Sequence, residues 1–259
     1  MIVRKSRAEL EAMREGGVIT AACIRMLREH ARPGVTTKEL DRLAEEFIRS
    51  RGGTPEFKGY QGFPASICTS PNDMIVHGIP GRYRLKEGDI ISLDVGVRYE
   101  GFVTDSATTV AVGEISPEAQ GLLDVTQECL EAATREVRPG NHLGDIGHAI
   151  QELAEGRGYG VVRDLVSHGV GREMHEDPQI PNYGKRGSGP RLLPGMTFAI
   201  EPMITLGSYE IKIDERDGWS IYTADGSLAA HYEHTIAVTD DGPWILTLEE
   251  GVDSRRKSA

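Results

Sequence analysis

Residues 90–110 read IISLDVGVRYEGFVTDSATTV, and the rest of the chain is organised around this stretch. Two runs rich in Val, Ile, Phe and Thr flank a short polar turn that ends at Gly101, a pattern typical of a β-hairpin. In an antiparallel pair of strands, the residue numbers of two opposite residues add up to the same sum along the whole pair. A two-residue turn at Tyr99 and Glu100, or a four-residue turn around them, gives a sum of 199, as do Asp94 and Asp105. We therefore expect these aspartates to face each other, with Cα atoms roughly 4.5–5.5 Å apart.

Two carboxylates held this close in an apolar setting repel each other, and burying them costs several kcal/mol unless something compensates. A proton shared between them would compensate, and so would a divalent cation, because carboxylate oxygens suit such ions. The alternative is a solvated hairpin that carries two exposed acids.

Composition excludes several classes of protein. The chain has 259 residues with 39% hydrophobic and 27% charged content, which is ordinary for a globular protein. A net charge of −11 argues against binding to nucleic acid or to a membrane surface. The three cysteines (Cys23, Cys68 and Cys129) form no CxxC motif, so neither a disulfide framework nor a thiolate zinc site is indicated. No signal-like segment opens the chain and no apolar run reaches 18 residues, so we expect a cytoplasmic protein.

Helical spacing of apolar residues predicts two pairs of helices. In the first pair, a helix over 7–31 is broken by Arg-Pro-Gly at 32–34, and the next helix is capped by Thr36 or Thr37 and stops at Gly52-Gly53. An irregular Gly/Pro-rich stretch from 54 to 81 precedes the hairpin. In the second pair, a helix over 117–137 is followed by one that ends at Arg157-Gly158.

These two pairs read as a hidden duplication. Arg-Pro-Gly recurs at 138–140, an offset of 106, and residues 88–94 align with 195–201 at an offset of 107. Such a repeat predicts two similar halves related by a pseudo-twofold axis, at about 1–113 and 114–250 of one catalytic domain, followed by a flexible tail at 251–259. The alternative is chance, because several matches are short. If the halves are related, Asp94 and Glu201 are symmetry mates that converge on one central site.

A further strand is expected over 231–238, where alternation places His231, Glu233 and Thr235 on one face. An acid is a poor choice within a strand on β-propensity alone. Glu233 is therefore either a functional residue or a charge that protects an edge strand.

Four carboxylates and one imidazole complete a candidate metal site: Asp94, Asp105, His168, Glu201 and Glu233. Oxygen-rich ligands of this kind suit two adjacent divalent ions and are wrong for a structural zinc site. Four negative charges would balance two such cations, which could clamp a tetrahedral intermediate. Two other histidines, His77 and His175, lie in glycine-rich segments; each could instead be an ordinary hydrogen-bonded residue.

The order and spacing of four segments carry a resemblance that covers about residues 1–250. DVGVRYEGFVTD, SHGVGREMHEDP, FAIEP and HYEHTIAV together closely resemble the type I methionine aminopeptidases of the pita-bread fold, in their short bacterial form. The resemblance implies an α+β fold of two halves around a curved, mostly antiparallel sheet covered by helices. It implies a metallo-exopeptidase that removes the initiator methionine from new polypeptides when the second residue is small, through a hydroxide that bridges two metal ions.

The same resemblance implies roles for individual residues. Asp94 and Asp105 would bind one metal, and Asp105, His168, Glu201 and Glu233 would bind the other or bridge. Glu201 would accept the proton of the water. His175 would hydrogen-bond the carbonyl oxygen, and His77 would contact the scissile nitrogen.

An apolar slot for the methionine side chain is implied around five residues: Tyr60, Phe63, Cys68, Met174 and Trp219. Each of them could equally be ordinary core. Met174 departs from the family, where an aromatic residue usually precedes the second loop histidine, but a flexible Met can still pack against a thioether. Phe57 stands where many bacterial relatives carry cysteine. Near Asn72 the family often holds a monovalent cation.

Two alternatives remain on the same fold: an Xaa-Pro dipeptidase or aminopeptidase, which shares all five ligands, and a non-catalytic binding protein, which typically loses them. The expected partners are nascent polypeptide N-termini, with transient proximity to the ribosome, and we expect a monomer. Co, Mn, Fe(II) and Zn all suit the ligands.

Overall fold

The computed structural model describes residues 2–252, so most of the predicted tail at 251–259 lies outside the described residues. Four long helices come in two consecutive pairs, and each pair is followed by a run of strands. The helices are α1 (Arg7–His30), α2 (Thr37–Ser50), α3 (Pro117–Glu136) and α4 (Leu143–Gly156), with one 3-10 turn at Tyr60–Gly62.

Helix ends follow the capping rules on which the predictions rested. Ser6 opens α1 with a capping box, in which its hydroxyl accepts from the Glu9 N–H and Glu9 Oε2 accepts from the Ser6 N–H at 2.8 Å. Thr36, rather than Thr37, caps α2, because its Oγ1 accepts from the Glu39 N–H at 3.2 Å. The predicted helices over 7–31 and 117–137 each end one residue early.

Strands fall into four small sheets, ordered β1-β4-β2 with β5 on β4, β13-β10-β6, β11-β12-β3, and β15-β14-β9-β7-β8. Every pairing between described strands is antiparallel. The strands are β1 (Thr54–Pro55), β2 (Cys68–Pro71), β3 (Met74–Val76), β4 (Ile90–Tyr99), β5 (Phe102–Ala111), β6 (Gly160–Val161), β7 (Val166–Gly169), β8 (Glu176–Pro181), β9 (Thr197–Ile200), β10 (Met203–Thr205), β11 (Ile211–Ile213), β12 (Ile221–Thr223), β13 (Ala229–His231), β14 (His234–Thr239) and β15 (Gly242–Ile245). The stretch 54–81, predicted to be irregular, therefore contributes three short strands.

The hairpin of β4 and β5 forms as expected, but its predicted register is wrong by two residues. Tyr99 pairs with Phe102, so the turn lies at Glu100 and Gly101, whose φ angles of 47° and 82° are both positive. A tight hairpin turn of this kind needs positive φ at both central positions, and Gly101 supplies one of them at no steric cost. Asp105 consequently lies opposite Gly96, and Asp94 lies opposite Ala107. The shift is an even number, so both aspartates still face the same side, as diagonal neighbours.

The strand predicted over 231–238 is two strands that break at Tyr232 and Glu233. Here β13 pairs with β10, whereas β14 pairs with β9 and β15. At the break the backbone pairs with the central hairpin instead. The Glu233 N–H donates to the Ala107 carbonyl at 2.9 Å, and the Glu233 carbonyl accepts from the Ala107 N–H at 3.3 Å. This exchange joins the second half of the chain directly to β5.

The duplication seen in the sequence recurs in the contacts. The Gly34 N–H donates to the Leu85 carbonyl, and at offsets of 106 and 107 the Gly140 N–H donates to that of Leu192. Isolated bridges repeat in the same way, at Thr36 with Arg84 and at His142 with Arg191. The two halves thus use one set of contacts twice, while their bounds at about 113 and 114 remain a prediction.

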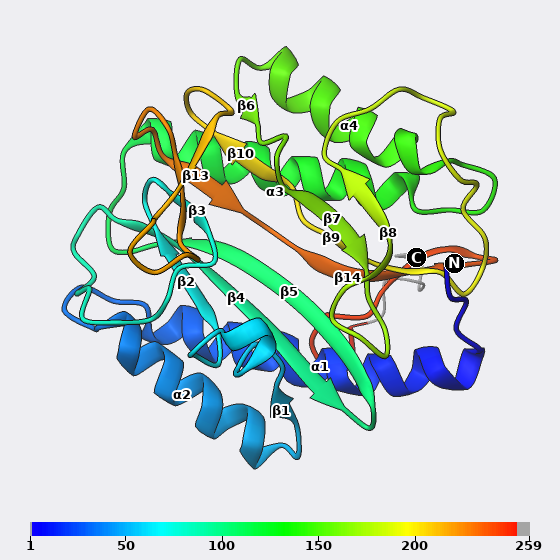
Figure 1. The fold of residues 1–259 in the computed structure, drawn as a ribbon, viewed down its shortest axis with the longest axis horizontal. Helices are drawn as coiled ribbons and strands as arrows, with labels where there is room; N and C mark the ends of the chain where they lie inside the picture. The colour runs from blue at the N-terminus through cyan, green and yellow to red at the C-terminus, as the bar shows by residue number, and fades with distance from the viewer. Residues whose placement is uncertain (1, 253–259) are drawn as a thin grey trace.

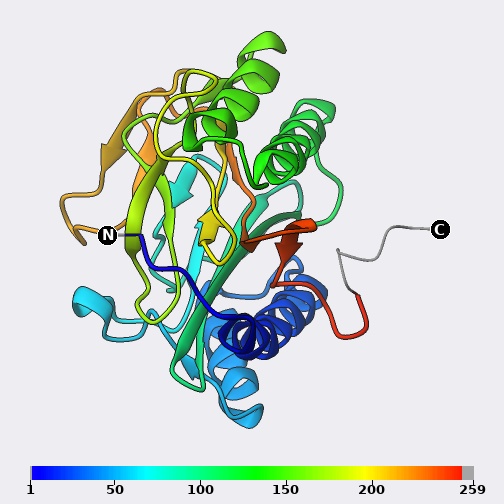
Figure 2. The same cartoon turned by 90° about the vertical axis from the view of Figure 1, so that its right-hand side faces the viewer.

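Two hydrophobic cores match these halves. One packs α1 and α2 against the outer side of β4, and the other packs α3 and α4 against β9, β10 and β14. Figure 1 shows the two helix pairs at opposite ends of the molecule, with β4, β5 and β14 running between them. The view in Figure 2 keeps the same separation. No helix within residues 2–252 has the length and apolar character needed to cross a membrane.

Candidate metal centre

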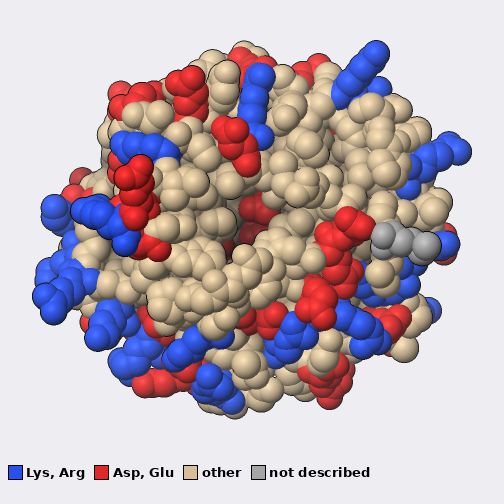
Figure 3. All heavy atoms as spheres, viewed as in Figure 1, with Lys and Arg blue, Asp and Glu red and all other residues tan. Residues whose placement is uncertain are grey.

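A small cavity lies on the inner side of the central strands. It has a volume of about 170 Å³ and is lined by Phe57, Tyr60, Gln61, Phe63, Cys68, His77, Asp94, Asp105, His168, Met174, His175, Glu201, Trp219 and Glu233. The structure thus brings together every predicted ligand, the two histidines predicted to be catalytic and the five predicted slot residues. In the space-filling view of Figure 3, the face is hollowed near its centre and acidic atoms lie at the bottom of the hollow.

Rigid elements position the two aspartates. Asp94, in β4, lies between Cys68 on β2 and Ala107 on β5. Asp105 is fixed through its backbone, because its N–H donates to Thr235 Oγ1 and its carbonyl accepts from the same hydroxyl, both at 2.8 Å. The central hairpin is therefore fastened to the second half of the chain at the residue that carries the carboxylate.

Glu201 follows β9 and is held by two buried polar residues. Its N–H donates to Ser167 Oγ at 2.9 Å, and its carbonyl accepts from Asn182 Nδ2 at 2.9 Å. Ser167 Oγ in turn donates to Asn182 Oδ1 at 3.2 Å. Glu233 sits at the break between β13 and β14, where its carbonyl accepts from Ser106 Oγ at 2.7 Å.

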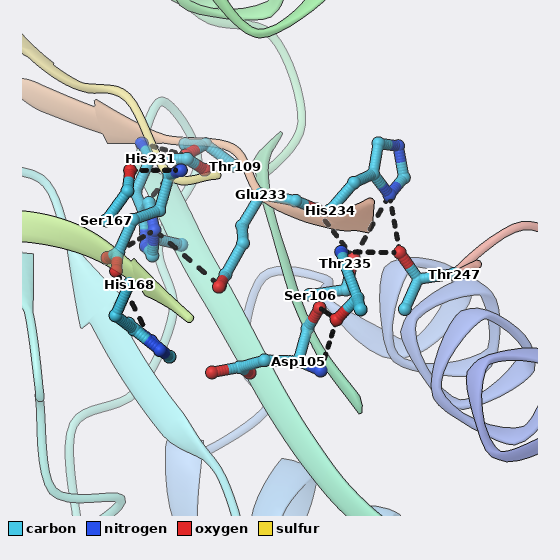
Figure 4. Close-up of polar contacts among 12 residues, drawn as sticks. Asp105, Ser106, Thr109, Ser167, His168, His231, Glu233, His234, Thr235 and Thr247 are labelled. Carbon is cyan, nitrogen blue, oxygen red and sulfur yellow. Dashed lines mark hydrogen bonds and ion pairs between the residues drawn. The ribbon is translucent and has the colours of Figure 1, made fainter. Parts of the chain in front are cut away.

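The imidazole of His168 is oriented as a metal ligand requires. Its Nδ1 lies 2.9 Å from the Gly169 carbonyl, which can only accept, so Nδ1 carries the proton and Nε2 keeps its lone pair. Nε2 lies 3.6 Å from Glu201 Oε1. Figure 4 shows Asp105, His168 and Glu233 converging from different elements.

Atoms of the cluster fit a divalent cation. One ligand atom each from Asp105, His168 and Glu233 lie within 4.8 Å of one another. Asp94 Oδ1, Asp105 Oδ1 and Glu233 Oε1 are buried and have no hydrogen-bond partner among the described residues. Among the described residues that line the cavity, none is Lys or Arg. Buried anionic oxygens without a donor or cation are unstable, so this donor set calls for bound positive charge.

Electrostatics lead to the same conclusion. Burial, with repulsion from neighbouring carboxylates, raises the pKa of Asp94, Glu201 and Glu233 well above the ordinary range, and burial raises the pKa of Asp105 to about 7. Burial lowers the pKa of His168 to about 3, which keeps the imidazole neutral and available as a ligand.

The metal-free protein should lose stability as the pH rises from about 6.5 to about 8. The unfolded chain releases the carboxyl protons near their ordinary pKa, whereas the folded chain retains them to higher pH, up to about 7 for Asp105. Below about pH 6.5 the buried histidines have the opposite effect, so that stability rises with pH. Burial lowers the pKa of His168 and His231 to about 3, and the unfolded chain therefore binds protons that the folded chain excludes. The melting temperature of chelator-treated protein should fall across this window, and saturating Mn²⁺ should remove the fall. A melting temperature that rises with pH without metal would contradict this reasoning.

His77 and His175 lie at the mouth of the cluster without joining it. His77 adopts a positive φ of 60°, a strained conformation that persists in proteins mainly at functional sites, and burial lowers its pKa to about 4. His175 Nδ1 lies 2.7 Å from the hydroxyl of Tyr60, and its ring centre lies 4.3 Å from that of His168. Burial lowers the pKa of His175 as well, so both rings are neutral near pH 7.

Apart from Gln61, the rest of the lining is apolar or aromatic. Phe63 packs edge-on against Trp219 at 5.1 Å between ring centres, and Met174 is 3% exposed. Phe57 lies against Gly96, where a Cβ would approach its ring to 2.5 Å. These side chains form one hydrophobic cluster with Cys68. The slot therefore ends in an aromatic and thioether wall beside the carboxylates.

Asn72 is the one predicted site residue that does not line the cavity. Its side chain donates to Asp89 Oδ1 at 3.0 Å and accepts from the Ile90 N–H at 3.1 Å. Its carbonyl accepts from the Ala229 N–H at 3.0 Å.

Sequence reasoning missed three buried residues that support the cluster: Ser167, Asn182 and His231. The hydrogen-bonding roles of Ser167 and Asn182 have no sequence signal, because they depend on how β7, β8 and β9 pair. His231 did carry a signal, since alternation placed it on the same face as Glu233.

Comparisons with known proteins agree with this geometry. Metallopeptidase family M24 matches residues 11–240. A methionine aminopeptidase of Clostridium acetobutylicum is 54% identical over 251 residues, which cover 96% of this chain and 100% of that protein. The crystal structure of a methionine aminopeptidase from Thermotoga maritima has a TM-score of 0.94 and 46% identity, covering 96% of this chain and 100% of that one. The predicted pita-bread fold is thereby confirmed.

A more distant structure bears on the alternative reading. Prolidase from Pyrococcus furiosus has a TM-score of 0.75 at 21% identity. The match covers 96% of this chain and 66% of that one. At that identity the likeness concerns the fold alone.

Proposed function

Because the chain belongs to metallopeptidase family M24, among the type I methionine aminopeptidases that remove the initiator methionine, we propose how its own residues divide this work. One observation carries the proposal: buried carboxylates and a neutral imidazole gather at the end of a small apolar slot.

Two divalent ions would be held by the cluster. Asp94 and Asp105 would hold one ion, and Asp105, His168, Glu201 and Glu233 would hold or bridge to the other. The four negative charges of the carboxylates balance the four positive charges of two divalent cations, which supports this stoichiometry. When bound, the ions supply Lewis acidity toward the peptide carbonyl and lower the pKa of water. Mn, Fe(II), Co or Zn would suit these ligands, and a monovalent cation would lie near Asn72.

Glu201 would accept the proton of the attacking water and pass it on toward the leaving amine. Its backbone is anchored at both the N–H and the carbonyl, so the side chain extends toward the cluster from a fixed point. His77 would donate to the scissile nitrogen from the opposite wall.

His175 would donate Nε2–H to the carbonyl oxygen as negative charge develops there. The hydroxyl of Tyr60, 2.7 Å from Nδ1, supports this role because a donor at Nδ1 leaves the proton on Nε2.

Replacing His175 by Ala should lower kcat by about 100- to 1,000-fold and change KM by no more than about threefold, since the donor acts on charge that is present only in the transition state. Steady-state kinetics on a Met-Ala-Ser peptide measure both constants. Tyr60→Phe serves as the milder companion, because it keeps the imidazole and removes only the hydroxyl. A large rise in KM with unchanged kcat would assign His175 to substrate binding instead.

The methionine side chain would occupy the slot formed by Tyr60, Phe63, Cys68, Met174 and Trp219, with Phe57 behind it. A second cavity, of about 430 Å³, shares His77, His168, His175 and Glu201 with the first and is also lined by Asp164 and Gln179, both exposed. One residue would thus enter the closed slot while the rest of the peptide leaves through the open side, which is the geometry that an aminopeptidase needs.

The function is tested by comparing release of methionine from Met-Ala-Ser with cleavage of an Xaa-Pro dipeptide, each with and without chelator. We expect metal-dependent release of methionine and negligible Xaa-Pro cleavage. Preferential Xaa-Pro cleavage would favour the proline-directed alternative, and no cleavage of either would favour a binding protein. We further propose that the enzyme acts in the cytoplasm on nascent N-termini near the ribosome, as a monomer.

A further inference from the structure

His231 is a buried histidine to which the proposed chemistry assigns no task. It ends β13 and is 1% exposed, and neither of its ring nitrogens has a hydrogen-bond partner among residues 2–252. Its backbone is fixed, because Thr109 Oγ1 accepts from the His231 N–H and donates to the His231 carbonyl, both at 2.8 Å. The side chain is therefore held in place by a rigid segment while its polar atoms lack partners.

Two oxygens of the carboxylate cluster lie close to the ring of His231. His231 Nε2 lies 3.6 Å from Glu201 Oε2 and 3.9 Å from Glu233 Oε2. On its other side Glu201 presents Oε1 to His168 Nε2, also at 3.6 Å. The Glu201 carboxylate thus lies between two imidazoles, and each imidazole faces a different oxygen.

A buried N–H without an acceptor destabilises the folded protein, so the neutral ring should carry its proton on the nitrogen that can reach an acceptor. The carboxylate oxygens of Glu201 and Glu233 near Nε2 are acceptors of this kind. The separation of 3.6 Å is longer than a hydrogen bond, but such contacts commonly tighten when an active site is filled.

We propose that His231 is a positioning residue, whose Nε2–H donates to Oε2 of Glu201 and fixes the orientation of that carboxylate in the loaded centre. Oε1, on the side of His168, is then the oxygen presented to the metal. This inference rests on the proposed role of Glu201 as proton acceptor.

Direct ligation of metal by His231 is the competing possibility. The ligand atoms that lie within 4.8 Å of one another among the described residues come from Asp105, His168 and Glu233, and His231 is not one of them. Because that grouping also omits Asp94 and Glu201, the metal stoichiometry of His231 variants is the measurement that separates ligation from positioning.

Two amide substitutions of His231 separate these possibilities, because their N–H groups lie at different distances from the backbone. In His231→Gln the terminal amide reaches about as far as Nε2, whereas in His231→Asn it stops near the position of Nδ1. His231→Leu removes every polar atom and serves as a third variant. Thermal melts of the metal-free proteins establish that each variant folds.

His234 is the matched control. It is a half-buried imidazole three residues further along, and its Nδ1 lies 2.9 Å from Thr247 Oγ1 and 3.4 Å from Ser106 Oγ. Figure 4 shows that its ring points away from Glu233, toward Thr247. His234→Gln therefore perturbs the same segment without reaching the carboxylates.

The experiment loads each protein with Co²⁺ and records the bound stoichiometry, the visible ligand-field spectrum, kcat and KM for Met-Ala-Ser. We expect His231→Gln and His234→Gln to keep the wild-type spectrum and a kcat within about threefold. His231→Asn and His231→Leu should keep the Co²⁺ stoichiometry, show an altered spectrum and lose about 10- to 100-fold in kcat with little change in KM.

Wild-type spectra and kcat in His231→Asn and His231→Leu would overturn the proposal. Loss of one Co²⁺ equivalent in every His231 variant, Gln included, would also overturn it, in favour of direct ligation. If wild-type protein releases no methionine, the proposed function fails. The spectra still decide the position of His231, because they need no turnover.

Discussion

Replacing Glu201 by Gln is expected to lower kcat about 1,000-fold or more while the protein still folds. The amide keeps the size of the side chain but cannot accept the proton of the attacking water. The amide is also uncharged, so it escapes the burial and repulsion that raise the pKa of Glu201 in the metal-free protein, and the folded state should not suffer. Single-turnover measurements on Met-Ala-Ser, with Mn²⁺ content determined on the same sample, separate loss of chemistry from loss of metal.

Glu131→Gln is the matched control for this variant. Glu131 is an exposed carboxylate on α3, and its substitution makes the same change in net charge without touching the cluster. The control should retain wild-type kinetics. Near-normal turnover by the Glu201→Gln protein would remove Glu201 from the proton path and would point to a base elsewhere in the cavity.

Replacing Asp105 by Asn should have two opposite effects. The variant should lose most of its Mn²⁺ affinity and about 1,000-fold or more in activity, since Asp105 would serve both ions and each ion contributes several kcal/mol to catalysis. The metal-free variant should nevertheless melt a few degrees higher than metal-free wild type, by about 3–6 °C at neutral pH, because a buried charge has been removed from a group of four.

This pair of outcomes distinguishes a metal site from an ordinary buried ion pair. In an ion pair, neutralising one partner leaves the other charge buried without a partner and lowers stability. A lower melting temperature for metal-free Asp105→Asn, measured alongside metal-free wild type in the same chelating buffer, would therefore contradict the view that the carboxylates are held against their mutual repulsion.

Local sequence signals were enough to place the helices and the central hairpin. The capping residue Thr36 and the Arg-Pro-Gly breaks located the helix ends to within about a residue, because those signals act within one turn. The register of β4 and β5 was wrong because the index sum alone cannot choose the turn. Only the need for positive φ at Glu100 and Gly101 decides it.

Long-range pairing accounts for what the sequence could not supply. The break between β13 and β14 arises because Glu233 turns its backbone to Ala107 of β5, a contact that alternation along one strand cannot reveal. The hydrogen bonds around Glu201 likewise depend on residues 167 and 182 meeting across paired strands. Their chemistry is evident only once β7, β8 and β9 are placed side by side.

For the apolar slot, the sequence identified the residues but could not establish their role. Met174 and Phe57 were noted as departures from the resembling family, and both lie in the wall of the cavity. Composition alone could not distinguish them from core residues, since Met174 is as buried as the residues of the main cores.

The central claim is that carboxylates from both halves of the chain gather at one point because paired cations neutralise them. A crystal structure of the protein grown with excess Mn²⁺, with anomalous scattering used to locate the metal, tests it most directly. We predict two manganese peaks, one against Asp94 and Asp105 and one against Asp105, His168, Glu201 and Glu233. A map in which these carboxylates surround only solvent, or in which no manganese scatters between them, would contradict the claim.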